Sequence, residues 1–295
     1  MKAYIEFIKH EIRMSRRHPV ALIVTLLFPV AYFIVFAEVF HLRKTPVSAG
    51  SFMCMSLVVG ILGNGLWAAG MRAVSERENN ILRRFRVLPI SPMPILCASI
   101  IGGWLVFFVL VPILCIVAWG VYRVTIPAHF MSFLVFVSLA MMAFRAMGLI
   151  VASGSNSAQE ATVLMQFLYI PMLFLSGATM PLAMLPGWLQ TLSRFTPGYE
   201  LLSGTQSIFV GGQSIWANGE AVAAMIVTLL VSLFVAVELF RWQKTDKVPF
   251  SSKAWILAIL APFVLLGAWK ISRGIDPSSV PTPKSPAITK PNHTQ

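Results

Sequence analysis

Charged residues gather in one short stretch, SERENNILRRFRVLP, at residues 75–89 between two long apolar runs. The whole chain is 57% hydrophobic and only 12% charged, so this gathering needs a physical reason. Ser75 followed by Glu78 fits the S-x-x-E capping box that begins a helix, and Pro89 would end that helix. No acid in the stretch faces a base four residues further along. The pattern therefore predicts binding: either phospholipid headgroups hold the helix, or its apolar face docks into a groove on a partner.

Patterns typical of catalysis are missing from the sequence. It contains no G-x-x-x-x-G-K-[S/T] run for binding nucleotide phosphates and no G-x-S-x-G run for a serine nucleophile. His10 and Glu11 resemble the start of a zinc-protease motif, but position 14 is Met, so the second ligand is absent. The three cysteines lack metal-ligand spacing, which favours packing roles for Cys54, Cys97 and Cys115. We expect no catalytic residue, metal or cofactor in this chain, and an intramembrane enzyme is a minor alternative.

Long apolar runs must position the charged stretch. The mean hydropathy is +0.77, far above that of a soluble domain. A helix needs about 20 apolar residues to cross the hydrocarbon of a bilayer. Six runs of about this length occur, at residues 20–41, 51–73, 94–122, 130–152, 158–179 and 217–240, and a shorter seventh candidate lies at 254–269. The sequence therefore predicts an all-α polytopic membrane protein.

The two ends of the chain differ from these runs. Residues 1–19 predict an amphipathic helix in the plane of the membrane surface, because isoleucines gather on one face and Lys2, Glu6, Lys9 and Arg13 on the other. Residues 243–271 are expected to comprise a linker and an extra transmembrane helix. Residues 272–295 are rich in Pro, Ser and Thr and predict a disordered tail.

Lysine and arginine predict the orientation. Fourteen of them lie in the N-terminal arm, around the charged stretch and after the sixth run, against four in the loops of the opposite side. Because cytoplasmic loops carry the excess of positive charge, the N-terminus and the charged stretch are expected in the cytoplasm. The net charge of +12 thus reflects topology, and nucleic acid is not an expected partner.

Four residues within the runs could carry function. Arg145 and Glu160 flank the turn at Ser153, and similar distances from it predict an intramembrane ion pair, as a structural lock more than a substrate contact. Asn64 and Trp67 lie among small residues of the second run, where helix packing is the main expectation and contact with a transported substrate the minor one.

Two segments resemble one family. The run SERENNILRRFRVLPISPMPIL is similar to the signature that follows the second span of ABC-2 type exporter permeases. The segment FLYIPMLFLSGATMPLAMLPGWLQTLSRFTPGYELLSG resembles that family's conserved segment after span five. The resemblance covers residues 1–242 and implies a six-helix transmembrane domain over residues 20–242, with a coupling helix at 75–89 and a re-entrant hairpin at 180–210.

The resemblance also implies roles for individual residues. The coupling helix would fit a cleft on a separate ATPase subunit, and its candidate contacts are Glu76, Arg77, Glu78, Leu82, Arg83, Arg84 and Phe85. The re-entrant hairpin would form an exit gate that includes Pro181, Pro186, Trp188 and Phe195, although an amphipathic pair resting on the outer surface is the alternative. ATP and Mg²⁺ would be bound by two ATPase subunits, which serve two permease subunits forming a homodimer.

The expected function is export of an amphiphilic or hydrophobic molecule, such as a drug, an antibiotic or a lipid-like compound, across the bacterial inner membrane. Two other classes stay open. An ion-coupled secondary transporter would show inverted repeats, and none is evident. A non-transporting membrane scaffold would have no use for a gate.

Overall fold

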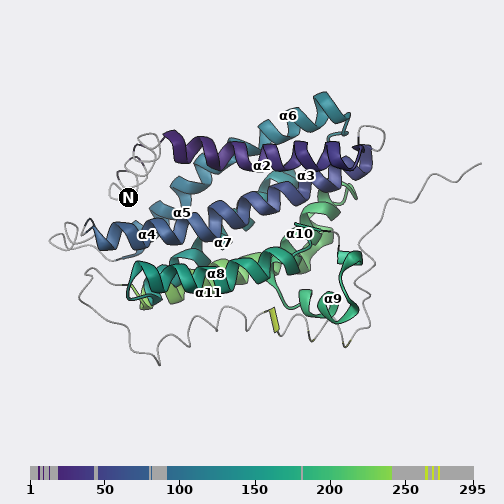
Figure 1. Ribbon diagram of the computed structural model, residues 1–295. Helices are drawn as coiled ribbons and strands as arrows, with labels where there is room; N and C mark the ends of the chain where they lie inside the picture. Colours follow the sequence, from purple (N-terminus) through teal and green to yellow (C-terminus); the bar gives the residue numbers. More distant parts are fainter. Residues whose placement is uncertain are drawn as a thin grey trace, which may run out of the picture.

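The computed structural model describes residues 19–42, 46–79, 81, 92–180 and 182–240, with a few single residues elsewhere (Figure 1). This part of the chain is almost entirely helical and contains no β-strand, which confirms the all-α prediction. The long helices are α2 (Pro19–Val39), α3 (Pro46–Ile61), α4 (Ala69–Glu78), α5 (Met93–Phe108), α6 (Leu110–Tyr122), α7 (Phe130–Gly154), α8 (Ala158–Leu175), α10 (Pro197–Phe209) and α11 (Gly219–Glu238). The short elements are the π-helix η2 (Leu62–Ala68), the 3₁₀ turns η4 (Leu182–Met184) and η5 (Ile215–Asn218), and α9 (Gly187–Ser193).

Five helical stretches in this part of the chain are long and apolar enough to cross a membrane. They are Ala49–Glu78, Met93–Tyr122, Phe130–Gly154, Ala158–Leu175 and Ile215–Glu238. Each coincides with a predicted span. Helix α2 lies at the remaining predicted span of the six, and its apolar part, Ile23–Val39, is shorter. The chain is therefore a multi-pass membrane protein.

Two of these stretches contain a break in their α-helical hydrogen bonding. The stretch Ala49–Glu78 passes from α3 through the π-helix η2 into α4 without leaving the helical path. The stretch Met93–Tyr122 changes from α5 to α6 at Val109, just before Pro112. Proline has no N–H to bond the carbonyl of Phe108, so the break falls where the sequence removes a donor.

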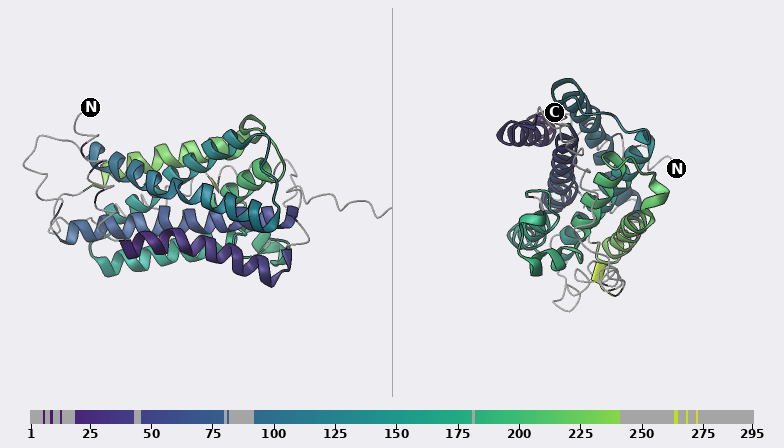
Figure 2. Two further views of the ribbon diagram at one scale, coloured as in Figure 1. Left: turned by 90° about the horizontal axis from the view of Figure 1, so that it is seen from above. Right: turned by 90° about the vertical axis from the view of Figure 1, so that its right-hand side faces the viewer.

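Helix α7 forms the centre of the bundle. It packs against α11, η2, α4, α5 and α10, and every residue from Ala143 to Gly154 is buried. Helix α8 lies beside α4 and η2 and exposes large apolar side chains, among them Phe167, on its outer face. Figure 2 shows the long helices running side by side along one axis. The polar groups of α7 from Ala143 to Gly154 are therefore enclosed by protein, whereas the outer face of α8 suits lipid.

The region predicted as a re-entrant hairpin contains the 3₁₀ turn η4 and the helices α9 and α10. Helices α9 and α10 lie at the end of the bundle opposite the end of α4 (Figure 1). Nearly all of α10 is buried, in contact with α3, α7 and α11, whereas α9 is largely exposed. Thr196 begins α10 as its N-cap, because its hydroxyl accepts the backbone N–H of Tyr199 at 3.3 Å, and Pro197 takes the first helical position.

Several predicted segments lie outside the described residues. Of the interfacial helix at 1–19, Glu6, Lys9 and Arg13 are described, together with Pro19, which begins α2; the first three are exposed, and Lys9 Nζ pairs with Glu6 Oε1 at 2.9 Å. Most of the candidate span at 254–269 and of the tail at 272–295 lies outside as well. Their placement therefore stays a prediction.

Candidate functional site at the end of α4

The charged residues at the end of α4 contact the turn between α7 and α8. Arg77 is 5% exposed, and its Nη1 donates to the carbonyl oxygen of Ala152 at 2.7 Å. Its Nη2 lies 3.4 Å from Ser155 Oγ, and that hydroxyl in turn donates to the Ala152 carbonyl at 3.1 Å. Carbonyls at a helix C-terminus lack intrahelical donors, so a guanidinium is a suitable partner there. Arg77 thus joins the end of α4 to the end of α7.

Glu78 makes the matching contact to α8. Its Oε1 accepts the backbone N–H of Ala158, the first residue of α8, at 2.8 Å. The first N–H groups of a helix have no internal acceptor and carry partial positive charge. A carboxylate from a neighbouring helix supplies both the missing acceptor and a favourable negative charge. Burial disfavours the charge of Arg77, and the carboxylates of Glu78 and Glu160 offset part of that cost. We call Arg77, Glu78, Ser155, Ala158 and Glu160 the α4–α8 junction.

The capping box predicted at Ser75 is wrong. Helix α4 runs without interruption from Ala69 to Glu78, so Ser75 lies in its last turns and no helix begins there. Instead, the same S-x-x-E pattern is a true N-cap at Ser157, whose hydroxyl accepts the N–H of Glu160 at 3.2 Å. Glu160 Oε2 accepts the N–H of Asn156 at 2.9 Å, which completes the start of α8. Ser157 was missed, although the sequence carries its signal as SAQE.

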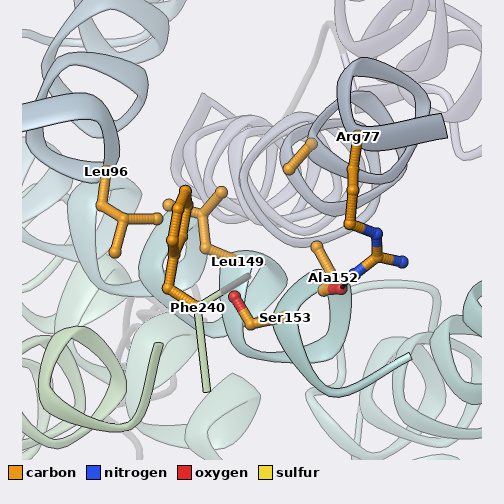
Figure 3. A pocket seen from close by; sticks show the side chains of 7 residues that line it. Arg77, Leu96, Leu149, Ala152, Ser153 and Phe240 are labelled. Carbon is orange, nitrogen blue, oxygen red and sulfur yellow. Dashed lines mark hydrogen bonds between the residues drawn. The ribbon is translucent and has the colours of Figure 1, made fainter. Parts of the chain in front are cut away.

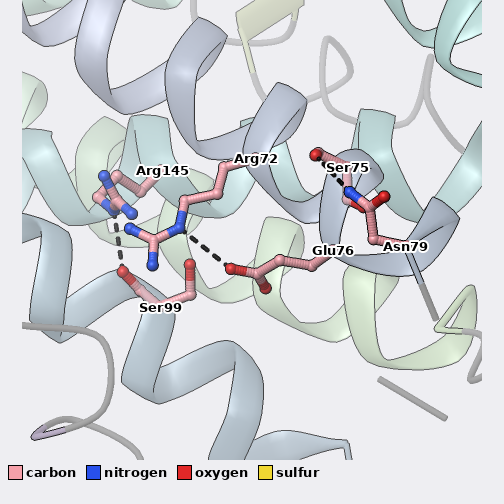
Figure 4. Close-up of polar contacts among 6 residues, drawn as sticks. All are labelled: Arg72, Ser75, Glu76, Asn79, Ser99 and Arg145. Atoms are coloured by element: carbon pink, nitrogen blue, oxygen red, sulfur yellow. Dashed lines mark hydrogen bonds and ion pairs between the residues drawn. The ribbon is translucent and has the colours of Figure 1, made fainter. Parts of the chain in front are cut away.

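Some of the remaining residues of the predicted coupling helix are described by the structure, and others are not. Glu76 pairs with Arg72, one turn earlier, at 3.1 Å, so it has a base within the helix after all (Figure 4). Asn79 ends α4, and its side-chain amide donates to the Ser75 carbonyl at 2.9 Å. Four further candidate contacts lie outside the described residues: Leu82, Arg83, Arg84 and Phe85.

A small cavity adjoins the junction. Arg77 and Ser153 line it together with apolar side chains that include Leu96 and Phe240 (Figure 3). Its volume is about 30 Å³, roughly that of one water molecule. It is therefore too small to hold a transported organic molecule.

Arg145 and Glu160 do not lie at similar depth, so the premise of their predicted pairing is wrong. Arg145 stands nine residues before the end of α7, about 14 Å at 1.5 Å per residue, whereas Glu160 is in the first turn of α8. Arg145 is 3% exposed; its Nε donates to the Ser99 carbonyl at 3.1 Å and its Nη1 to Asn64 Oδ1 at 3.2 Å. Figure 4 shows the contact with Ser99. The turn between the two helices spans Ser155–Ser157, and counting from Ser153 hid this offset.

Asn64 and Trp67 both belong to η2 but point to different neighbours. Asn64 accepts from Arg145 of α7, while the Trp67 ring packs edge-on against Tyr169 of α8 with centroids 5.6 Å apart. Both residues are half-buried. Tyr169 was not predicted, because no local pattern marks a contact between distant helices.

The predicted gate residues lie around α9. Pro186 is its exposed N-cap residue, and the Trp188 side chain is 68% exposed. Phe195 does not share a helical face with Trp188, because α9 ends at Ser193. Pro181 lies outside the described residues. Just before this region, Tyr32 Oη of α2 donates to the Ala178 carbonyl at 2.9 Å and holds the end of α8.

No group of three His, Cys, Asp or Glu side chains that could hold a metal occurs in the described part of the chain.

Comparison with known proteins identifies the family. The model of the ABC-2 type transporter family matches residues 3–210. The chain is 20% identical over 229 residues to the transport permease YvfS of Bacillus subtilis, covering 76% of this chain and 93% of that protein. It is 26% identical over 194 residues to the inner membrane transport permease YhhJ of Escherichia coli, covering 65% of this chain and 51% of that protein, about half its length. Since the family model covers more than half of the sequence, this chain belongs to the ABC-2 type transporter family.

Proposed function

We propose that this chain is the permease subunit of an ATP-driven exporter in the bacterial inner membrane. Membership of the ABC-2 type transporter family and similarity to transport permeases support a permease role. The sequence lacks a P-loop, so ATP and Mg²⁺ would be bound by a separate ATPase. We infer two ATPase subunits and two copies of this chain, with the N-terminus in the cytoplasm, because positive charge concentrates on that side.

The α4–α8 junction is the observation that carries the coupling part of the proposal. The segment that follows Asn79 comes directly after Arg77 and Glu78 in the chain. Those two side chains face inward, to the ends of α7 and α8. A force applied by an ATPase to the segment after α4 would therefore reach α8 through short, charge-assisted hydrogen bonds.

This arrangement divides the candidate coupling residues by role. Arg77 and Glu78 hold the bundle, so we assign them to transmission. Glu76 and the outlying residues Leu82, Arg83, Arg84 and Phe85 are assigned to contact with the ATPase.

Helix α8 connects the junction to the proposed exit gate. It runs for 18 residues, about 27 Å, from Ala158 to the turn that precedes η4, α9 and α10. We infer that its movement opens the segment at 180–210, where Trp188 would rest at the membrane surface. The substrate is inferred to be amphiphilic or hydrophobic, with Trp67 and Tyr169 on its pathway, while Asn64 serves the helix contact to Arg145.

The test is to purify the tagged chain from its native membranes and identify any co-purifying ATPase. The complex is then reconstituted in vesicles, and ATP hydrolysis and export of a fluorescent amphiphile are measured together. Glu78→Gln removes the charge that meets the start of α8, and Glu6→Gln is the control at an exposed glutamate. We expect Glu78→Gln to hydrolyse ATP while exporting less per ATP, and Glu6→Gln to match the wild type.

Absence of any ATPase from the complex would refute ATP-driven export. Transport that persists without ATP and stops when ionophores collapse the ion gradients would instead indicate a secondary transporter. Equal export per ATP in Glu78→Gln and wild type would refute only the role of the α4–α8 junction in coupling; it would not contradict ATP-driven export.

A further inference from the structure

A π-helix, η2, interrupts the membrane-crossing stretch Ala49–Glu78. In η2 the backbone N–H of Ala69 bonds to the carbonyl of Asn64, five residues earlier, where an α-helix would use a spacing of four. A π segment contains one residue more than the α-helix it replaces, and it is seldom stable unless its surroundings fix it. The described contacts of η2 show what fixes it here.

The guanidinium of Arg145 connects η2 to two other helices. One nitrogen donates to the side chain of Asn64 in η2, and another donates to the backbone carbonyl of Ser99 in α5. Because Arg145 belongs to α7, three helices meet at one side chain that is 3% exposed. A buried cation is stable only with such oriented acceptors, so the geometry around it is tightly specified.

Glycines make room for this contact. A Cβ placed on Gly103 of α5 would lie 1.8 Å from Arg145 Cζ and 2.0 Å from Nη1, so the guanidinium occupies the space a side chain would fill. At Gly65 of η2, a Cβ would lie 3.1 Å from Phe144 Cβ of α7. The backbone of η2 therefore lies close to α7 at Gly65, and the guanidinium of Arg145 contacts η2 at Asn64.

We propose that Arg145 is a positioning residue that holds η2 in its π-helical form and thereby sets the rotation of α4. Each residue of an α-helix turns the chain by about 100°, so removing the extra residue of η2 would rotate α4 by about that angle relative to α3. Arg77 and Glu78 would then leave the α7–α8 turn. The proposal concerns helix register, and it holds whether or not the chain is an ATP-driven exporter.

Disulfide cross-linking can measure the rotation of α4. Met71 Sδ of α4 lies 3.9 Å from Thr162 Oγ1 of α8, so Met71→Cys with Thr162→Cys reports on the register after η2. The native cysteines are replaced by alanine for this pair. A second pair reports on the part of the bundle before η2: native Cys54 of α3, whose Sγ lies 3.9 Å from the Thr205 carbonyl of α10, with Thr205→Cys, in a chain whose Cys97 and Cys115 are replaced by alanine.

Two substitutions disturb the contact in different ways. Gly103→Ala fills the space of the guanidinium, and Arg145→Lys keeps the charge but loses the fork that reaches both acceptors. Gly120→Ala is the matched control, because a Cβ there has no atom within 4 Å. Oxidation uses a membrane-permeant copper complex on the full-length chain in its native membranes, and the cross-linked product is read by mobility on a denaturing gel.

We expect Gly103→Ala and Arg145→Lys to lose most of the cross-link between positions 71 and 162 while keeping the one between 54 and 205. Gly120→Ala should keep both. If both variants retain the cross-link between 71 and 162 at the wild-type level, the proposal is overturned. Loss of both cross-links would show that the contact supports the whole bundle and not the register of α4, which also contradicts it.

Discussion

The close backbone contact of α7 with η2 and α4 predicts that Gly148→Ala destabilises the protein. A Cβ on Gly148 of α7 would lie 2.3 Å from the carbonyl oxygen of Leu66 and 3.1 Å from the backbone nitrogen of Gly70. Backbone atoms on both sides cannot move aside like a flexible side chain. Helix α7 would therefore have to separate from η2 and α4 by about 1 Å, and overpacking of this kind costs about 1–3 kcal/mol.

The matched control is Gly120→Ala in α6, where an added Cβ meets nothing within 4 Å. Both substitutions gain the same helix propensity, about 1 kcal/mol, so the difference between them isolates the packing cost. The assay is thermal unfolding of the two detergent-solubilised variants, followed by size-exclusion chromatography of a fluorescent fusion.

At about 2–4 °C for each kcal/mol in a chain of this size, Gly148→Ala should unfold several degrees below Gly120→Ala. An equal or higher midpoint for Gly148→Ala would refute the close contact between α7 and η2.

Three further substitutions test the helix ends and the exposed surface by the same assay. Ser157→Ala removes the N-cap of α8 and should cost about 1 kcal/mol, whereas Ser75→Ala, within α4, should cost clearly less; the reverse order would restore the capping box to Ser75. Thr196→Ala removes the N-cap of α10 and should also cost about 1 kcal/mol, so an unchanged midpoint would argue against that cap. Trp216→Ala should change stability in detergent by less than about 0.5 kcal/mol, because the Trp216 side chain is 90% exposed; a large loss would indicate a buried contact.

The membrane-crossing stretches could be predicted from the sequence because length and apolar content are local properties. The family could be predicted because its motifs are continuous in the chain. The predicted start of the coupling helix at Ser75 was wrong for a related reason. A capping box is a local pattern, and both SERE at 75–78 and SAQE at 157–160 fit it. Only the second comes just after the end of another helix, α7, and the pattern alone could not separate the two.

The contacts between helices could not be predicted, because they depend on depth and rotation. The depth of Arg145 was judged by counting residues from Ser153. The turn lies later, at Ser155–Ser157, so Arg145 is several residues further from the turn than Glu160 is. The π-helix adds a rotation that no hydropathy pattern records. Gly103 gives no local sign that it accommodates a guanidinium from another helix.

The burial of α10 has a consequence for how the protein is made. With 13 residues and the buried Glu200, α10 is too short and too polar to be stable alone in lipid. In the folded protein α10 packs against α3, α7 and α11, and α11 is synthesised after α10. The burial of α10 is therefore complete only after the last of these three neighbours has entered the membrane. Any truncation within α11 would remove one of the three surfaces that bury α10 and should expose it to membrane quality-control proteases.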